Sequence, residues 1–429
     1  MNRISFHTFG CRLNQSETSI IENSFAVNGY KIVSLSEKPD VVVVNTCTVT
    51  ENGDADTHRL VNKINRLNPN ARIALVGCQA QIQKEKLLKM PNVRWVVGNA
   101  KKMELLSIIG QSTLQSDPQV IAPNFTKESF TLQSAGFDSR HTRANLKVQD
   151  GCDFFCTFCE IPFARGRARS RVFNDLLTEA RALVSFGHKE IVLTGVNLGT
   201  YQNDGKTILD VIDALEKIED LKRIRISSIE PTTVPFELIE RMGKTKLCRH
   251  LHIPLQSGSD EILKRMQRKY TRSEFADFIL RARRTVPDIC IGTDVIVGFP
   301  GETDRHFEQT AEFIREMPFA YAHVFSYSDR TLNKSGEYFP KVPIKTIHAR
   351  SKTLRELSAR KRLAFQKNLL QTHQDVLFEE QKNGCWQGTT DHYVKVAVKN
   401  SDVPLANTIA RVLIQSATST RVTGEIVSQ

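Results

Sequence analysis

Residues 151–159 read GCDFFCTFC, so Cys152, Cys156 and Cys159 lie on one short stretch in the spacing CxxxCxxC. Thiolates this close in sequence can converge on a single metal centre. A [4Fe–4S] cluster has four irons and takes cysteine thiolates as ligands, so three cysteines leave one iron open to another ligand. A structural zinc site prefers four closed ligands, commonly in CxxC pairs, and a second pair does not follow. The stretch therefore predicts a three-thiolate cluster with one open position.

Length and composition restrict the class of protein. With 429 residues, the chain is long enough for about two to four domains. Its net charge of +12 favours a polyanionic partner such as nucleic acid, although many basic proteins bind none. Nine cysteines, an odd number, fit metal ligation in a reducing compartment better than a disulfide framework. The first residues, MNRISFHTFG, lack an apolar signal region, and we expect a cytoplasmic monomer without membrane contact.

The N-terminal part of the chain alternates between apolar runs and helical patterns. Strands are predicted at 3–9, 41–44, 73–76 and 93–97, with helices at 14–28 and 54–68 and a further helix that ends at Met90. This βαβ succession predicts a doubly wound α/β domain over residues 1–112. Residues 113–140 are polar and are predicted to be a linker.

Three further cysteines occupy equivalent places in this N-terminal domain. Cys11, Cys47 and Cys78 each follow a predicted strand and precede a predicted helix. In a parallel sheet the carboxyl ends of the strands share one edge, so these side chains should meet there. A helix N-terminus also favours the thiolate form. Singly, each is more readily explained as a core cysteine at a strand end, but together they predict a second three-thiolate cluster.

Residues 141–369 alternate strands with longer amphipathic helices. The predicted strands are 146–149, 190–194, 223–227, 250–254, 289–297 and 320–325. Six such units predict a partial (β/α)6 barrel of the TIM type, with its active site at the carboxyl ends of the strands. The three-cysteine stretch follows the first of these strands and should lie at that mouth.

The C-terminal residues 370–429 change to short strands. These are predicted at 375–379, 392–398, 408–416 and 418–427, with Asn383-Gly384 as a turn. They predict a small antiparallel β-barrel of the general type that binds nucleic acid.

Polar residues and glycines at other strand ends are candidates for cofactor binding at the barrel mouth. Taken singly, each is explained by turn chemistry or helix capping, but their shared position favours a binding role. The candidates are Gly195, Asn197, Glu230, Gln256, Ser257 and Asp294.

The whole chain resembles the radical S-adenosylmethionine (SAM) methylthiotransferases. The resemblance is carried by CxxxCxxC, by residues 8–17 (TFGCRLNQSE), 45–50 (NTCTVT) and 149–152 (QDGC), and by the order of the three domains. The motifs look most like the MtaB subfamily, in which the C-terminal barrel is called a TRAM domain. The resemblance implies conversion of N6-threonylcarbamoyladenosine (t6A) at tRNA position 37 to its 2-methylthio form.

The resemblance also implies cofactors and roles. Two [4Fe–4S] clusters and SAM are the expected cofactors, and the six cysteines are the expected metal ligands and catalytic residues. The cluster on Cys152, Cys156 and Cys159 would bind SAM and produce a 5′-deoxyadenosyl radical, and the cluster on the other three would hold the sulfur. The expected partners are the anticodon arm of tRNA and an external electron donor.

Alternative functions remain open on sequence alone. The substrate could be an N6-isopentenyladenosine (i6A) tRNA or a ribosomal-protein aspartate, although GCRLN at residues 10–14 differs from the GCQMN and GCPKN of those relatives. A non-catalytic RNA-binding protein with zinc sites is the other alternative. The chain departs from the family pattern at Glu160, where an apolar residue is usual, and at 326–336, to which no role is assigned.

Overall fold

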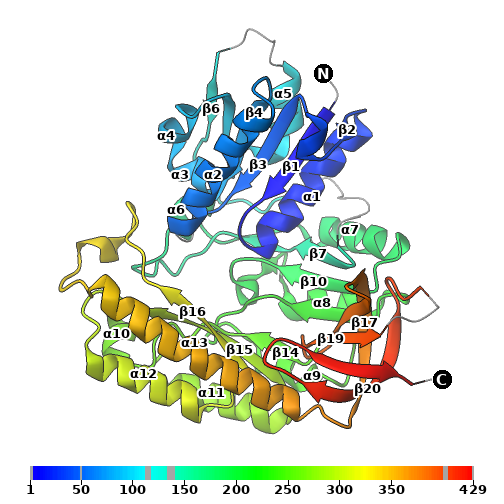
Figure 1. Ribbon diagram of the computed structural model, residues 1–429, viewed down its shortest axis with the longest axis vertical. Helices are drawn as coiled ribbons and strands as arrows, with labels where there is room; N and C mark the ends of the chain where they lie inside the picture. The colour runs from blue at the N-terminus through cyan, green and yellow to red at the C-terminus, as the bar shows by residue number, and fades with distance from the viewer. Residues whose placement is uncertain (1–2, 49–50, 112–116, 133–140, 400–403, 428–429) are drawn as a thin grey trace.

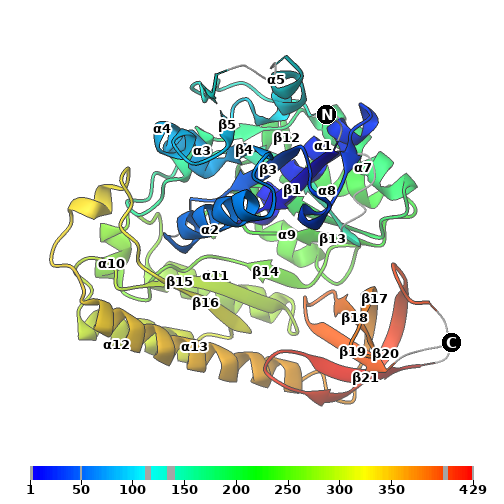
Figure 2. The ribbon, with the colours of Figure 1, turned by 45° about the horizontal axis from the view of Figure 1, so that its top comes forward.

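The computed structural model describes residues 3–48, 51–111, 117–132, 141–399 and 404–427. Three domains follow one another along the chain (Figure 1). The N-terminal α/β domain lies over the central strand–helix domain, and the C-terminal β-barrel lies at one side of the central domain (Figures 1 and 2). The long helix α13 (Ile344–Lys367) packs along the central domain and leads into the C-terminal barrel.

The N-terminal domain contains a six-stranded parallel sheet in the order β2-β1-β3-β4-β5-β6. Its strands are β1 (Arg3–Thr8), β2 (Lys31–Ile32), β3 (Val41–Thr46), β4 (Arg72–Gly77), β5 (Val93–Gly98) and β6 (Gln119–Ile121). Its helices are α1 (Arg12–Val27), α2 (Glu51–Leu67), α3 (Cys78–Ile82), α4 (Lys84–Leu88) and α5 (Leu105–Gln111).

Alternate residues of these strands pack on opposite faces of the sheet. Val41 and Val43 join a core that includes Phe25 of α1. Val42 and Val44 join a second core with residues of α2, α3 and α4. Because successive side chains of a strand point to opposite faces, a run of four buried valines requires helices on both sides. The predicted doubly wound sheet is confirmed.

Two details of the N-terminal domain differ from the predictions. Part of the predicted linker 113–140 belongs to the sheet, because β6 pairs in parallel with β5. This edge strand has only three residues, too few to show a periodic pattern. The helix predicted to end at Met90 is two short helices, α3 and α4, which meet at Gln83.

The central domain is built from two three-stranded parallel sheets, β7-β10-β13 and β14-β15-β16. Their strands are β7 (Arg143–Lys147), β10 (Glu190–Thr194), β13 (Arg223–Ile226), β14 (His250–His252), β15 (Cys290–Val297) and β16 (Tyr321–Ser326). A parallel bridge between Ile224 and Leu247 joins the two sheets, so the six strands follow chain order in an open barrel.

Helices cover the outside of this barrel around one continuous core. They are α7 (Phe173–Ser185), α8 (Ile208–Glu216), α9 (Phe236–Arg241), α10 (Asp260–Arg265), α11 (Arg272–Thr285) and α12 (Asp304–Glu316). The predicted (β/α)6 architecture is confirmed. The helices described in the structure include none that is both long and apolar enough to cross a membrane.

The C-terminal domain is a closed five-stranded barrel in the order β17-β18-β19-β21-β20. Its strands are β17 (His373–Lys382), β18 (Cys385–Thr390), β19 (Lys395–Lys399), β20 (Ile409–Ala417) and β21 (Val422–Ile426). Strand β18 was not predicted, and β19 pairs with β21 in parallel, so the barrel is mainly but not wholly antiparallel.

Arginines of the central domain hold the C-terminal barrel in place. Arg223 donates to the carbonyl of Thr389 at 3.0 Å, and Arg225 donates to the carbonyls of Thr390 at 3.1 Å and Asp391 at 2.8 Å. These backbone acceptors lie at the end of β18 and in the turn that follows it. Buried carbonyls bound to charged donors make a specific joint, so we infer a fixed position for this barrel.

Candidate functional site

The CxxxCxxC cysteines lie on the loop between β8 (Gln149–Asp150) and α6 (Ile161–Arg165), beyond the carboxyl end of β7. All three are free thiols. Burial, and to a lesser degree the neighbouring Cys156, raises the pKa of Cys152 to about 11. Burial also raises the pKa of Cys159, to which Cys156 and Cys152 both add. The three thiols therefore lie near one another on this loop, as ligands of a single centre must.

A buried arginine contacts this cysteine set. Arg268 Nη1 donates to Cys156 Sγ at 3.3 Å. The same guanidinium forms an ion pair with Glu230, whose pKa is raised by burial despite this pairing. Arg268 thus places a positive charge and a hydrogen-bond donor beside Cys156, whose thiolate would otherwise be buried without a compensating partner.

The second cysteine set lies at the carboxyl edge of the N-terminal sheet. Cys11 is the N-cap of α1, Cys78 is the first residue of α3, and Cys47 follows β3. A Cβ on Gly10 would lie 2.8 Å from Cys47 Sγ, so Cys47 packs directly against the residue before Cys11. Surrounding protein raises the pKa of Cys11, and Cys78 lies close enough to raise it further.

Both cysteine sets fit the clusters that the sequence predicts. In each, three free thiols lie on one loop or at neighbouring strand ends and helix N-termini, and those N-termini favour negative charge. Cysteine is the usual protein ligand of iron–sulfur clusters, and metal binding displaces the proton of each thiol. We therefore propose Cys11, Cys47 and Cys78 as ligands of one cluster and Cys152, Cys156 and Cys159 as ligands of the other.

A network of buried ion pairs connects segments that adjoin the two cysteine sets. Lys147 and Arg165 contact Glu17 of α1 at 2.7 and 3.0 Å, and Lys102 is also paired with Glu17. The same Lys147 and Arg165 contact Asp150 at 2.7 and 2.9 Å. All five side chains are at most 5% exposed.

The network fixes how the N-terminal domain meets the barrel. Burial alone would raise the pKa of Glu17, but Arg165, Lys102 and Lys147 hold it well below its usual range. Glu17 lies on the helix that begins after Cys11, whereas Asp150 precedes the CxxxCxxC loop and Arg165 follows it. Ion pairs of this kind are favourable only when all partners are held in place. The network therefore ties the helix behind one cysteine set to both ends of the other.

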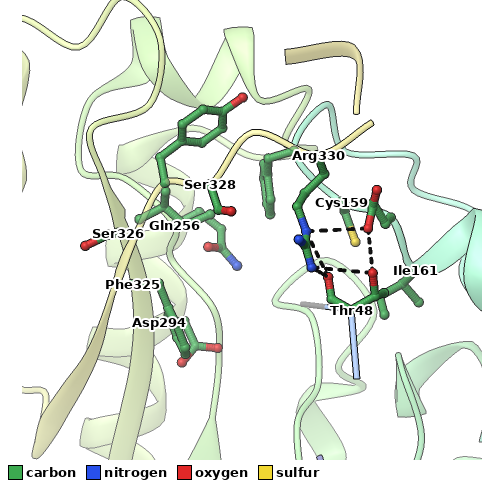
Figure 3. A pocket seen from close by; sticks show the side chains of 13 residues that line it. Thr48, Cys159, Ile161, Gln256, Asp294, Phe325, Ser326, Ser328 and Arg330 are labelled. Carbon is green, nitrogen blue, oxygen red and sulfur yellow. Dashed lines mark hydrogen bonds and ion pairs between the residues drawn. The ribbon is translucent and has the colours of Figure 1, made fainter. Parts of the chain in front are cut away.

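A cavity of about 190 Å³ opens beside the CxxxCxxC loop. Its lining includes Cys159, Gln256, Asp294 and Arg330, and Thr48 reaches it from the N-terminal domain (Figure 3). The cavity thus lies between one cysteine set, the ends of β15 and β16, and the residue that follows Cys47. It is the place at which a substrate could meet both centres.

The predicted cofactor-binding residues separate into groups. Gln256 and Asp294 line the cavity. Glu230 reaches the cysteine loop through Arg268. Asn197 is buried, its Oδ1 accepts from Thr233 at 2.8 Å, and its Nδ2 has no hydrogen-bond partner within the described structure.

Gly195 and Ser257 are the remaining two of the predicted cofactor-binding residues. A Cβ on Gly195 would lie 3.0 Å from Gln149 Oε1, so this glycine allows the loop after β10 to approach the strand that precedes the cysteines. Ser257 is buried, and its hydroxyl lies 3.3 Å from that of Thr310 and accepts from the amide of Ser259 at 3.2 Å. Within the described structure, the hydrogen bonds of Ser257 are therefore with its own turn and with helix α12, not with the cavity.

Some site residues were missed at the sequence level. Gln149 Oε1 accepts from the amides of Val196 and Asn197 at 2.8 and 2.9 Å, which couples the loop after β10 to the cysteine loop. Glu17 carried a usable signal, because a charged residue stands on the otherwise apolar face of α1 with Leu13 and Ile20. For Arg268 no such signal exists.

Comparisons with known proteins agree with this architecture. Residues 146–314 match the family model of the radical SAM superfamily. Residues 3–98 match a model described as uncharacterized protein family UPF0004. A solved radical SAM methyltransferase from Kitasatospora setae shares the fold with a TM-score of 0.54, at 13% identity, over 76% of this chain and 73% of that one. The chain is therefore a radical-SAM enzyme with an additional N-terminal cysteine domain.

Curated relatives narrow the class. A threonylcarbamoyladenosine tRNA methylthiotransferase of Aquifex aeolicus is 36% identical, over 96% of this chain and 100% of the relative. The Bacillus subtilis protein of that name is 38% identical, over 94% and 91%. A tRNA-2-methylthio-N(6)-dimethylallyladenosine synthase of Cereibacter sphaeroides is 33% identical, over 99% and 98%. The chain belongs to the radical-SAM methylthiotransferase family, whose cofactors are [4Fe–4S] clusters and SAM.

Proposed function

We propose that this enzyme adds a methylthio group to C2 of t6A at position 37 of tRNA. The observation that carries this function is a cavity lined both by Cys159 of one three-cysteine set and by Thr48, the residue that follows Cys47 of the other set. One set would suffice for radical chemistry alone. A second set whose neighbouring residue reaches the same cavity supports sulfur transfer, because the sulfur must be delivered where the radical acts.

The clusters and SAM, when bound, supply the radical that activates C2 and the sulfur and methyl group that replace its hydrogen. The chain itself positions these groups. Arg268 stabilises the thiolate of Cys156, and Gln256 and Asp294 line the space available to SAM and the adenine. The basic surface and the C-terminal barrel support binding of the anticodon arm through its phosphates. An external protein would supply electrons, and we expect the enzyme to act as a cytoplasmic monomer.

Two observations favour t6A over i6A as the substrate. Four t6A-named relatives are 33–38% identical to this chain, and four dimethylallyladenosine-named relatives are 32–34% identical. In addition, t6A carries a carboxylate, whereas the isopentenyl group of i6A is a hydrocarbon. Arg12, beside Cys11, donates to an amide oxygen of Asn145 and to the hydroxyl of Tyr393, neither of which is a carboxylate. Its positive charge therefore favours an anionic substituent near this cysteine set.

Nucleoside mass spectrometry of tRNA from a deletion strain tests the proposal. The strain should lose 2-methylthio-t6A and retain t6A. Wild-type enzyme should restore the modification, whereas Cys11→Ala and Cys156→Ala should each fail to restore it. Loss of 2-methylthio-i6A instead would assign the enzyme to the alternative tRNA substrate, and an unchanged tRNA profile would reject a tRNA role.

A further inference from the structure

Glu160 directly follows the cysteine Cys159, and its side chain is buried at 7% exposure. The hydroxyl of Thr48 donates to Glu160 Oε2 at 2.7 Å. Thr48 directly follows Cys47, a member of the other cysteine set. A single hydrogen bond therefore joins the residue after one predicted cluster ligand to the residue after another, although 112 positions separate them in sequence.

Arg330 closes this contact from a third segment. Its guanidinium lies 3.6 Å from Glu160 and 2.8 Å from Asp54. It also points toward Thr48, to whose carbonyl it donates (Figure 3). The backbone amide of Leu332 donates to Glu160 Oε1 at 3.4 Å. The loop over residues 326–336 thus contacts residues that directly follow a cysteine of each set, Thr48 after Cys47 and Glu160 after Cys159.

The chemistry of this contact makes it rigid. A buried carboxylate is tolerated only when charged or hydrogen-bonding partners compensate for its lost hydration. Here Thr48, Arg330 and the amide of Leu332 fill that role, and they come from two domains. Displacement of the N-terminal domain would remove the hydrogen bond from Thr48 to Glu160 and the hold that Arg330 has on Thr48 and Asp54. An apolar residue at this position could pack against Thr48 but could not bind its hydroxyl or attract Arg330.

We propose that Glu160 is a positioning residue that, with Thr48 and Arg330, holds the two cysteine sets at a fixed separation and orientation. The proposal rests on the two-cluster function proposed above. It gives a role to the loop 326–336 and to the carboxylate at position 160. This role differs from ligation or proton transfer, because Glu160 acts through the residues beside the ligands.

The first test is the coupling between radical formation and sulfur transfer. Glu160→Ile should still produce 5′-deoxyadenosine from SAM, but with about tenfold less methylthio product per 5′-deoxyadenosine, because displacement by an ångström can slow an oriented reaction by up to a hundredfold. Glu160→Gln retains an acceptor for Thr48 and should fall between wild type and Glu160→Ile. An unchanged ratio in Glu160→Ile would overturn the proposal.

The second test does not measure turnover. With both clusters reduced, electron paramagnetic resonance reports the magnetic interaction between them, which depends on their separation and orientation. Glu160→Ile should alter this interaction, and Thr48→Val should alter it similarly. In the double variant, the fall in methylthio product per 5′-deoxyadenosine should be smaller than the two single-variant factors multiplied together, because both substitutions remove the same hydrogen bond. An unaltered spectrum or fully multiplicative effects would contradict the proposal.

Glu179→Gln is the matched control. Glu179 is also a buried carboxylate, and it is paired with Arg171 within the central domain. Its substitution should lower stability without changing the spectrum or the product ratio. If Glu160→Ile behaved like this control, the role of Glu160 would be purely structural. If wild-type enzyme made no methylthio product while its spectrum showed two interacting clusters, the proposed function would fail and the positioning role would stand.

Discussion

Glu17 is the residue whose replacement should most weaken the junction between the N-terminal domain and the barrel. Its carboxylate is fully buried and paired with three cations: Lys102, Lys147 and Arg165. Glu17→Gln preserves the shape but leaves these cations with Asp150 as their remaining carboxylate partner in the network.

The expected loss of stability follows from this imbalance. With Arg169, which lies 3.7 Å from Asp150, the intact network contains four positive and two negative groups, and the substitution leaves four against one. Removal of one partner from a buried ion pair typically lowers the free energy of unfolding by about 3–5 kcal/mol, because the other charge remains buried. An amide at Glu17 can accept hydrogen bonds but not balance charge, so we expect a loss of about 3 kcal/mol or more.

Tryptophan fluorescence provides the assay. The chain has two tryptophans, and Trp95 is buried in the N-terminal sheet whereas Trp386 lies in the C-terminal barrel. In a Trp386→Phe background, urea unfolding followed by Trp95 reports the N-terminal domain. Glu104→Gln, at an exposed carboxylate 2.7 Å from Lys101, is the control and should change stability by less than about 0.5 kcal/mol. A similarly small change for Glu17→Gln would refute the reasoning.

Three further predictions concern single side chains. Arg268→Gln should shift the reduction potential of the cluster bound through Cys156 by about 50 mV to more negative values, because a charged hydrogen bond to the thiolate is lost; a redox titration measures this. Burial alone would lower the pKa of His392, but the carboxylates of Asp288 and Asp391 raise it overall. His392 therefore stabilises the folded protein below about pH 6.5, and this contribution is lost as pH rises through the raised pKa. The unfolding free energy of His392→Gln relative to wild type, measured from pH 6 to 9, should therefore show a deficit that shrinks with pH, and a constant deficit would contradict this assignment. Arg12→Gln should reduce turnover of t6A tRNA about tenfold while cleaving SAM at the wild-type rate, and equal loss of both would argue against a role in substrate binding.

Periodicity and turn chemistry predicted most of the fold. Strand β10 has the predicted bounds, because its apolar run is framed by polar residues. Strand β18 was missed because Gly388 and two threonines follow Trp386 without apolar alternation, and because strand pairing depends on distant partners. A side chain at Gly388 would meet the carbonyl of Leu377 on the neighbouring strand, a close approach that sequence does not reveal.

The site was predictable where it follows from topology. Cys11 and Cys78 could be placed together because strand ends of a parallel sheet share an edge. The contacts of Glu160 and Arg268 could not be predicted, because they depend on the docking of domains and loops far apart in sequence. Charged residues are by default assigned to the surface, so the burial of the cations that pair with Glu17 was also hidden.

Iron analysis of matched variants tests the central claim, that two cysteine sets each hold a cluster. Wild-type enzyme reconstituted without oxygen should contain about eight irons per chain, since each [4Fe–4S] cluster has four. Replacement by alanine of Cys11, Cys47 and Cys78 together should leave about four, and so should replacement of Cys152, Cys156 and Cys159. A colourless wild-type protein that retains zinc, or an iron content unaffected by either triple replacement, would contradict the account.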